Sequence, residues 1–257
     1  MDNIANTSND WTCNIKIKIM FGKETFINKK ILIYGLGISG KSCLKYLNKN
    51  NQVKVFDDNK NLKNKKNQNI FLNKNSINKK DFDYIVISPG IDIKKYKLKK
   101  YLVKNKKKII TELDIFYLNF PTNTKIVITG TNGKSTTCQL LFNIFKSNNI
   151  DVRLVGNIGN SPLLEKKINK KTIFIVEASS YQIFYCRYFR SDYAAILNLS
   201  PDHLERHGNI NKYAKAKLKL IFDQEKNKQA YIEKNNLLIN KNILNKDIKS
   251  NLVKLNF

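Results

Sequence analysis

Two segments of this chain place a short apolar run directly before a glycine-rich loop and a helical pattern, and this arrangement constrains the fold most. The first is the run KILIY at 30–34, followed by GLGISG at 35–40. The second is the run KIVIT at 125–129, followed by GTNGKST at 130–136. A strand, a glycine loop and a helix in this order are typical of phosphate-binding α/β folds. We therefore expect an α/β protein with parallel sheets.

Further apolar runs continue this alternation of strands and helices. Strands are expected at 52–56, 82–88, 152–155, 172–176 and 194–199, and helices at 41–50 and 137–147. The range 109–118 is ambiguous between the two. From about Glu225 onward Lys and Asn dominate, and the pattern supports no assignment.

A change of pattern divides the chain near residues 119–124, where Pro121 and a polar cluster interrupt the alternation. We predict a Rossmann-like parallel-sheet domain at 29–120 and a P-loop-type α/β central domain at 121–257. Residues 1–28 are expected to form an N-terminal extension that is partly disordered, with Met20 as an alternative start to Met1.

The net charge of +27 comes from 47 Lys and Arg against 20 Asp and Glu. Nucleic-acid binding would explain such a charge, but Lys is mixed with Asn and Ile along the whole chain, as in 59–69 and 73–80. This even distribution favours a compositional bias of the whole chain over a basic binding surface. We therefore expect no nucleic-acid partner and only some electrostatic attraction of anionic substrates.

The sequence also bears on the compartment. No apolar run approaches the roughly 20 residues of a membrane span, so we expect no membrane partner. The four cysteines form no C-x-x-C pair and no metal-ligand spacing. Free thiols of this kind are typical of a reducing compartment, and we expect a cytoplasmic protein.

The first glycine loop fits the dinucleotide-binding fingerprint, because Gly35, Gly37 and Gly40 follow a strand and Asp57 ends the next strand about 20 residues on. Glycines let backbone N–H groups approach a diphosphate, and the following helix N-terminus adds favourable partial charge. The loop indicates a diphosphate ligand, with NAD as one candidate. A tight turn without a ligand is the alternative.

The second glycine loop resembles a P-loop, although Ile128 stands where the standard pattern has its early glycine. Lys134 would neutralise charge on the β- and γ-phosphates of ATP, and the hydroxyl of Ser135 would be a ligand to Mg²⁺. The residues predicted to bind ATP are Gly130, Thr131, Asn132, Gly133, Lys134, Ser135, Thr136 and Thr137.

The motif TGTNGKST at 129–136 is similar to the ATP-binding loop of the Mur ligases and of their relatives, the folylpolyglutamate synthetases. Four further blocks follow in the order of that family: GNIG at 156–159, EASSYQ at 177–182, NLSPDHL at 198–204 and YAKAK at 213–217. Five ordered blocks are more specific than either loop alone, and together they resemble the Mur ligase family. The resemblance implies a reaction in which ATP activates a carboxylate as an acyl phosphate, which an amine then attacks.

The same resemblance implies roles around ATP. Glu177 and His203 would hold Mg²⁺ together with Ser135, and Lys217 would be carbamylated by CO₂, which turns a cation into an anion that helps to hold the metal. Sequence alone does not separate Lys217 from nearby lysines, and the family register selects it. The predicted catalytic residues are Lys134, His203 and Lys217, and the predicted metal ligands are Ser135, Glu177, His203 and Lys217.

The first loop indicates which branch of the family the chain resembles. Folylpolyglutamate synthetases begin close to their P-loop, and the L-alanine-adding ligases usually carry GTHGKT there. GLGISG, together with SPGI at 88–91, is similar to the D-glutamate-adding ligases, whose first domain binds the UDP of UDP-N-acetylmuramoyl-L-alanine. The residues predicted to bind this substrate are Gly37, Ile38, Ser39, Asp57, Asp58, Gly90, Asn157, Ser180 and Gln182.

The family has a third domain that carries much of the D-glutamate site, whereas this sequence stops at Phe257. We therefore expect an incomplete central domain and a chain that binds the UDP-sugar without completing ligation efficiently. We also expect a monomer. Another Mur-type or folylpolyglutamate-type amide ligase stays open as an alternative. Two functions from other classes also stay open. An NAD-dependent dehydrogenase would leave the second loop unused, and a nucleic-acid-binding module would explain the charge alone.

Overall fold

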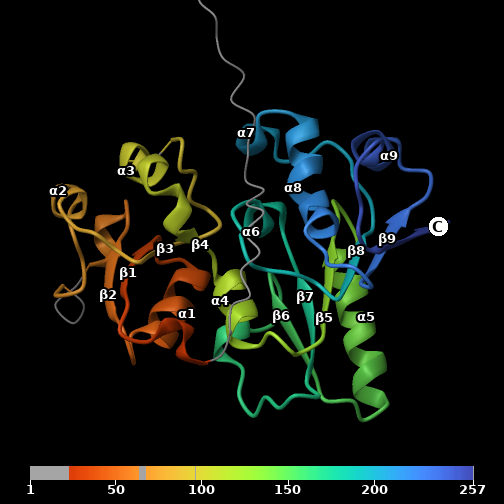
Figure 1. Ribbon diagram of the computed structural model, residues 1–257, viewed down its shortest axis with the longest axis horizontal. Coiled ribbons are helices and arrows are strands. Elements are labelled where there is room, and N and C mark those ends of the chain that lie inside the picture. Colours follow the sequence, from red (N-terminus) through yellow and green to blue (C-terminus); the bar gives the residue numbers. More distant parts are fainter. Residues whose placement is uncertain (1–22, 64–67, 96, 257) are drawn as a thin grey trace, which may run out of the picture.

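The computed structural model describes residues 23–63, 68–95 and 97–256, which form two parallel sheets with helices packed around them (Figure 1). The first sheet has the order β2-β1-β3-β4 and the second the order β10-β9-β8-β5-β7-β6. Every strand pair in both sheets is parallel. The predicted α/β class with parallel sheets is confirmed.

The elements of the first half are β1 (Lys30–Tyr34), α1 (Ile38–Leu47), β2 (Gln52–Phe56), α2 (Lys74–Asn78), β3 (Tyr84–Ile87), α3 (Lys99–Lys104), β4 (Ile109–Ile110) and α4 (Glu112–Asn119). The elements of the second half are β5 (Lys125–Thr129), α5 (Lys134–Ser147), β6 (Val152–Gly156), β7 (Ile173–Glu177), α6 (Ser180–Phe184), β8 (Tyr193–Ile196), α7 (Leu204–His207), α8 (Ile210–Phe222), β9 (Gln229–Glu233), α9 (Leu237–Ile243) and β10 (Asn251–Leu255). Short 3₁₀ turns lie at Lys23–Phe26, Lys60–Leu62, Lys106–Lys108 and Pro162–Leu164.

Burial explains why the central strands read as unbroken apolar runs. Ile31, Leu32 and Ile33 of β1 are each fully buried, because helices or loops cover both faces of a parallel sheet. In β5 the same holds for Val127 and Ile128. The chain therefore alternates apolar strands with half-exposed helices, which is the pattern that the sequence displays.

Helix α4 joins the two sheets into one core. Thr111 and Asp114 close a capping box at its start, which fixes where the helix begins. Phe116 of α4 packs edge-to-face on Phe174 of β7, with ring centroids 4.7 Å apart. One cluster of buried apolar residues accordingly runs from the first sheet through α4 into the second.

The structure resolves two regions that the sequence left uncertain. The ambiguous range 109–118 splits into the two-residue strand β4 and the helix α4. The segment after Glu225 forms β9, α9 and β10, and both strands pair in parallel at one side of the second sheet. Their apolar runs are short, so the sequence pattern alone did not reveal them.

Packing against the first sheet begins before the expected start at Lys29. Residues Lys23–Phe26 form a 3₁₀ turn, and Phe26 is buried with its ring centroid 5.2 Å from that of Tyr84. Part of the range 1–28 therefore belongs to the first packed unit. The expectations for residues 1–22, including the alternative start at Met20, concern a segment outside the described residues.

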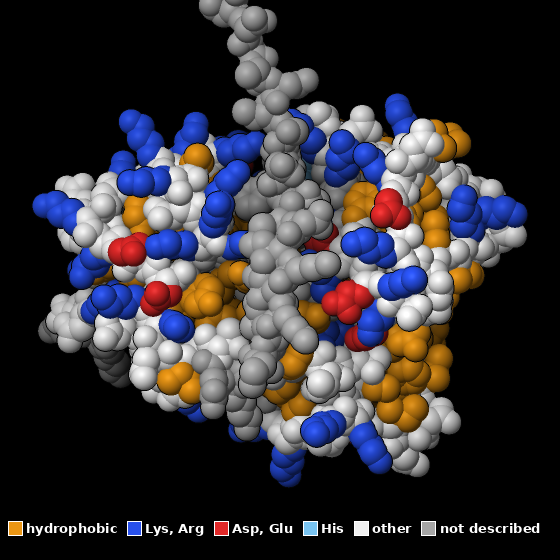
Figure 2. Space-filling model, in the orientation of Figure 1, with side chains coloured by type: hydrophobic (Ala, Val, Ile, Leu, Met, Phe, Trp, Pro, Cys, Tyr) orange, Lys and Arg blue, Asp and Glu red, His pale blue; other side chains and the backbone are white. Residues whose placement is uncertain are grey.

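On the face shown in Figure 2, Lys and Arg side chains are scattered over both halves of the molecule, with Asp and Glu among them. They do not gather over one element of this face, which fits the even distribution of Lys in the sequence. Within the described ranges, no helix combines the length and the apolar character needed to cross a membrane.

Candidate functional site

Both glycine loops lie where the strand order of a sheet reverses direction. The first loop follows β1, whose neighbours are β2 and β3, and the second follows β5, whose neighbours are β7 and β8. In open α/β sheets ligands bind in such crevices at the carboxyl ends of the strands. A cleft of about 360 Å³ opens between the loops. Its lining residues are Ile38, Ser39, Pro89, Lys134, Gly156, Asn157, Gly159, Ser161, Ser179, Ser180, Tyr181, Gln182, Asp202, His203 and Lys217.

The backbone of the second loop depends on its glycines. Gly130 and Gly133 have φ of 155° and 79°, and a Cβ on Gly130 would lie 3.2 Å from the Cβ of Leu197. Gly133 directly precedes the 14-residue helix α5, whose N-terminus offers free N–H groups and a favourable field for an anion. Nζ of Lys134 donates to the carbonyl of Thr131 at 2.8 Å, so its ammonium group lies against the loop.

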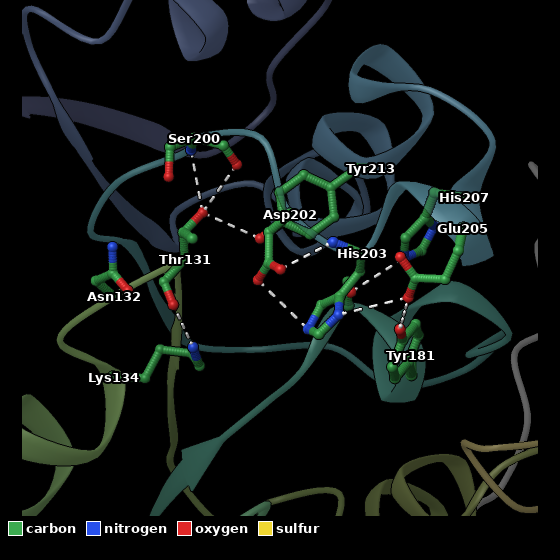
Figure 3. Close-up of polar contacts among 12 residues, drawn as sticks. Thr131, Asn132, Lys134, Tyr181, Ser200, Asp202, His203, Glu205, His207 and Tyr213 are labelled. Carbon is green, nitrogen blue, oxygen red and sulfur yellow. Dashed lines mark hydrogen bonds and ion pairs between the residues drawn. The ribbon is translucent and has the colours of Figure 1, made fainter.

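Residues that follow β8, together with Tyr213 of α8, hold the second glycine loop in place. The carboxamide oxygen of Asn198 accepts the N–H groups of Thr131 and Asn132, at 3.1 and 2.8 Å. The hydroxyl of Thr131 accepts the N–H of Ser200 and bonds to the hydroxyl of Tyr213, both at 3.0 Å (Figure 3). Sequence analysis assigned no role to Asn198 or Tyr213. The only signal for them in the sequence was that they belong to the blocks NLSPDHL and YAKAK.

Glu177, at the end of β7, is buried and receives two hydrogen bonds from residues of other blocks. The hydroxyl of Ser135 donates to it at 2.7 Å, and the amide nitrogen of Asn157 donates at 2.8 Å. A carboxylate and a hydroxyl in contact are hard oxygen donors of the kind that Mg²⁺ prefers. These two residues therefore fit a Mg²⁺ site. Within the described residues, this site included, no group of three or more His, Cys, Asp or Glu residues is placed to hold a metal.

Lys217 of α8 is buried beneath the same loop. Its Nζ donates to the carbonyl of Gly130 at 2.7 Å and to the hydroxyl of Thr129 at 3.4 Å. Burial, followed by repulsion from Lys134, lowers the pKa of Lys217 to about 7. A substantial part of the amine is then uncharged at neutral pH, which is the form that reacts with CO₂.

The neighbouring lysines differ in this respect. Lys215 is exposed, and Lys219 forms an ion pair with Asp223 one helical turn away. Of the three lysines, Lys217 alone is directed at the second glycine loop. The structure therefore gives a physical reason for the register that the family resemblance selected.

His203 lies at the cleft but is not joined to Glu177 or Lys217. Its imidazole is within 3.4 Å of Asp202 and 3.8 Å of Glu205, and its ring lies 4.9 Å from that of Tyr181 (Figure 3). Its backbone has a φ of 51°, a left-handed conformation, at the position that directly precedes α7. The role of His203 as a metal ligand stays a prediction.

His207 is buried, and its ring contacts other residues of the protein. Its Nε2 bonds to the hydroxyl of Ser180 at 3.0 Å, and its ring stacks on Tyr181. Burial, then repulsion from Arg206, lowers the pKa of His207 to about 4, so it is neutral at physiological pH. The hydroxyl of Ser180 therefore already has one hydrogen-bond partner, His207.

The side chain of Gln182 also forms a hydrogen bond within the protein. Its side-chain oxygen accepts the N–H of Ser179 at 2.9 Å in the capping box of α6. For a ligand it retains its amide N–H₂ group.

The residues predicted to bind substrate in the first half divide into two sets. Ile38 and Ser39 line the cleft, and Ile38 is 87% exposed. Asp57 instead shapes the first loop, because its carboxylate accepts the N–H of Leu36 at 2.7 Å. Asp58 bonds to the hydroxyl of Tyr34.

Gly37 and Gly90 are both exposed, and the carbonyl of Gly90 accepts a hydrogen bond from Arg206 at 3.2 Å. Neither these glycines nor the two aspartates line the cleft. Their contacts with substrate stay predictions.

The described cysteines Cys43, Cys138 and Cys186 are free and buried, as the sequence suggested for free thiols. Burial raises the pKa of Cys138 to about 12, which keeps it protonated and unreactive.

Comparison with known proteins identifies the family. Residues 29–111 match the family model "Mur ligase MurD-like, N-terminal domain", and residues 128–255 match "Mur ligase middle domain". The UDP-N-acetylmuramoylalanine--D-glutamate ligase of Elusimicrobium minutum is 37% identical over 244 residues, which covers 88% of this chain and 53% of that protein. The protein of the same name from Rickettsia prowazekii is 33% identical over 217 residues, covering 83% and 48%.

Solved structures share the fold. The UDP-N-acetylmuramate:L-alanyl-gamma-D-glutamyl-meso-diaminopimelate ligase from Neisseria meningitides has a TM-score of 0.57 at 15% identity, over 88% of this chain and 78% of that one. The chain spans about half the length of the curated relatives it matches. Two family models in the expected order and relatives above 30% identity confirm the predicted resemblance: this chain belongs to the Mur ligase family.

Proposed function

We propose that this chain supplies the UDP-binding and ATP-binding parts of an ATP-dependent ligase that adds D-glutamate to UDP-N-acetylmuramoyl-L-alanine in peptidoglycan precursor synthesis. The observation that carries the proposal is the single cleft onto which both glycine loops open, with Ser39 on one side and Lys134 on the other. The names of the most similar relatives support D-glutamate as the amine.

The phosphates of ATP would lie against the second loop. Lys134, which now donates to the Thr131 carbonyl, would turn its ammonium group to the β- and γ-phosphates. The N-terminus of α5 adds N–H donors. Because Asn198 and Tyr213 hold the loop in place, little reorganisation is needed when charge moves during phosphoryl transfer.

Ser135 and Glu177 would hold Mg²⁺, with His203 and carbamylated Lys217 completing the proposed set. When bound, Mg²⁺ would neutralise charge on the transferred phosphoryl group. The uncharged Nζ of Lys217 would attack the carbon of CO₂, form an N–C bond and release one proton to water. The burial of Lys217 and the lowered pKa of its amine support this step, because they favour the neutral amine.

The substrate would bridge the two halves, with its diphosphate at Ile38 and Ser39 and its carboxylate end near Asn157, Ser180 and Gln182. Asp57, Asp58, Gly37 and Gly90 would support the uridine end. We also propose that the enzyme is monomeric and cytoplasmic, which is consistent with the free buried thiols.

Calorimetric titration of the chain tests the proposal. We expect micromolar binding of UDP-N-acetylmuramoyl-L-alanine and of AMP-PNP with Mg²⁺, and a loss of at least tenfold in AMP-PNP affinity for Lys134→Ala with the UDP-sugar affinity unchanged. Lys215→Ala, an exposed lysine on α8, is the matched control. Binding of NADH in place of the UDP-sugar would show that the first loop serves a dehydrogenase.

A further inference from the structure

Arg206 of α7 reaches from the second half of the molecule to the first. Its guanidinium donates to three successive backbone carbonyls, those of Pro89 and Gly90 at 3.2 Å and that of Ile91. These carbonyls form the turn that follows β3. A planar guanidinium with several fixed donors can satisfy such a row of acceptors at once, whereas a lysine ammonium cannot hold the same geometry.

Two aromatic rings hold the guanidinium in position. It lies 5.4 Å from the ring centroid of Tyr181 and 5.9 Å from that of Tyr185, both within the range of a cation–π interaction. Arg206 is half-buried, so water competes weakly for its donors. The hydroxyl of Tyr185 in turn accepts the N–H of Ile93 from the first half, at 3.4 Å.

A second cation crosses in the opposite direction. Nζ of Lys95, which follows the same turn of the first half, donates to the carbonyl of Glu205 at 3.0 Å. The segment 89–95 and helix α7 are therefore joined by two contacts, one from a cation on each side. The hydroxyl of Tyr181 also donates to the carboxylate of Glu205 at 3.2 Å (Figure 3). The aromatic support and the crossing contacts therefore share residues and form one cluster.

This cluster lies at the wall of the cleft. Pro89, whose carbonyl Arg206 holds, lines the cleft together with Ile38 of the first loop, while His203 on the other wall lies one helical turn before Arg206. Arg206 therefore connects the two walls of the cleft. The function proposed above assigns no role to Arg206.

We propose that Arg206 is a positioning residue that clamps the turn after β3 to α7 and so fixes the distance between the two glycine loops. For its consequence in ligand binding, this inference rests on the proposed function. Arg206 itself touches no reacting group. It acts through Pro89 and through the helix that carries His203.

The distance between the halves tests the clamp without any ligand. Spin labels would be placed on cysteines introduced at two exposed positions, Lys45 of α1 and Lys146 of α5, in a Cys13→Ser background, because the described native thiols are buried. We expect one narrow distance distribution in the parent chain. Arg206→Ala should broaden it at least twofold, and Arg206→Lys should give an intermediate width.

Arg190→Ala is the matched control. The Arg190 guanidinium also donates to backbone carbonyls, those of Arg187 and Phe189, but within its own half. We expect its distance distribution to equal that of the parent. A loss of stability alone would lower the melting temperature of both variants and leave both distributions narrow. An unchanged distribution in Arg206→Ala would overturn the proposal.

Calorimetry on the same variants connects the clamp to the ligands. UDP-N-acetylmuramoyl-L-alanine is expected to bind Arg206→Ala about tenfold more weakly than the parent, with AMP-PNP–Mg²⁺ affinity changed less than twofold. If the parent binds neither ligand, the proposed function fails, while the distance distributions still decide the clamp. Equal UDP-sugar affinity in a chain with a broadened distribution would show that the clamp does not serve this substrate.

Discussion

Lys217 illustrates how the surroundings of one residue decide its chemistry. The chain has many lysines, and in the sequence this one differs from Lys215 and Lys219 only through its place in the family block. The structure adds burial, a bond to the Gly130 carbonyl and a lowered pKa, which no local sequence pattern could indicate because they arise from packing between α8 and β5. His203 is the opposite case, since the resemblance assigned it a role that the described contacts do not test.

Burial of Lys217 should make stability depend on pH in a defined window. The pKa of its amine is 10.5 when unfolded and about 7 when folded, so between these values the unfolded chain binds a proton that the folded chain has lost. The free energy of unfolding contributed by this residue therefore rises from pH 7 to pH 10.5 and is lowest, and constant, below pH 7. Lys217→Met removes the titration. We compare the free energy of unfolding of the Met variant with that of the parent. Because only the parent gains stability as the pH rises, the value for the Met variant minus the value for the parent should fall by about 2–4 kcal/mol between pH 7 and pH 10.

Urea unfolding at pH 7, 8, 9 and 10 in CO₂-free buffer measures this difference. Lys215→Met, at an exposed position on the same helix, is the control, and its difference from the parent should stay constant over the range. A constant difference for Lys217→Met as well would mean that the buried amine keeps an ordinary pKa. Added bicarbonate should raise the stability of the parent but not of the Met variant.

At the scale of elements, strands were predictable where an apolar run ends at a glycine loop or, as in β2, at a polar turn. Strands β1, β2 and β5 begin and end at the expected residues. Helices α1 and α5 each begin three residues earlier than expected, because Gly37 and Gly133 cap them directly and the residues that follow each of these glycines form the first turn. The strands β9 and β10 were missed, since their place depends on parallel pairing with β8, which is distant in sequence.

The packing of α1 on β1 depends on Gly40. An added Cβ there would lie 1.8 Å from the carbonyl oxygen of Gly35, which is backbone and cannot move aside. Gly37→Ala, in the same loop, would place its Cβ in open space at a φ of −68°. We expect Gly40→Ala to lower the free energy of unfolding by about 3 kcal/mol or more and Gly37→Ala by about 1 kcal/mol or less.

Urea unfolding followed by circular dichroism gives both values. Equal losses in the two variants would contradict the close approach of helix and strand at Gly40. Because the third glycine of such a fingerprint serves helix–strand packing and the second serves the approach of a ligand, Gly37→Ala should instead weaken UDP-sugar binding in the folded chain.

At the scale of the whole molecule, the two sheets are not independent. The expected division at 119–124 stays a proposal, because α4, the last element before it, contributes Phe116 to the core of the second sheet. Glu112 of α4 adds a further connection on the cleft side, since its carboxylate accepts the hydroxyls of Ser42 in α1 and of Ser161, which caps the 3₁₀ turn at Pro162–Leu164, each at 2.5 Å. Both observations indicate that the halves gain stability from each other.

Asp114 of α4 makes a further connection of this kind. One oxygen of its fully buried carboxylate accepts three backbone N–H groups of the second half, from Arg187, Tyr188 and Phe189, at 2.7–3.0 Å. Asp114→Ala leaves these three buried donors without an acceptor, and we expect a loss of about 3–5 kcal/mol in the free energy of unfolding. Asp114→Asn, which keeps one oxygen but places an N–H₂ group against Thr111, should lose less.

Hydrogen exchange followed by mass spectrometry shows where this loss is felt. Because one core joins the two sheets through α4, amides of β1 and of β5 should lose protection together in both Asp114 variants. The matched control is Asp151→Asn, whose carboxylate bonds to Thr172 and Asn169 within the second half. It should reduce protection in β5 and leave β1 unchanged. If β1 also keeps its protection in Asp114→Asn, the halves unfold separately and α4 acts only as a tether between them.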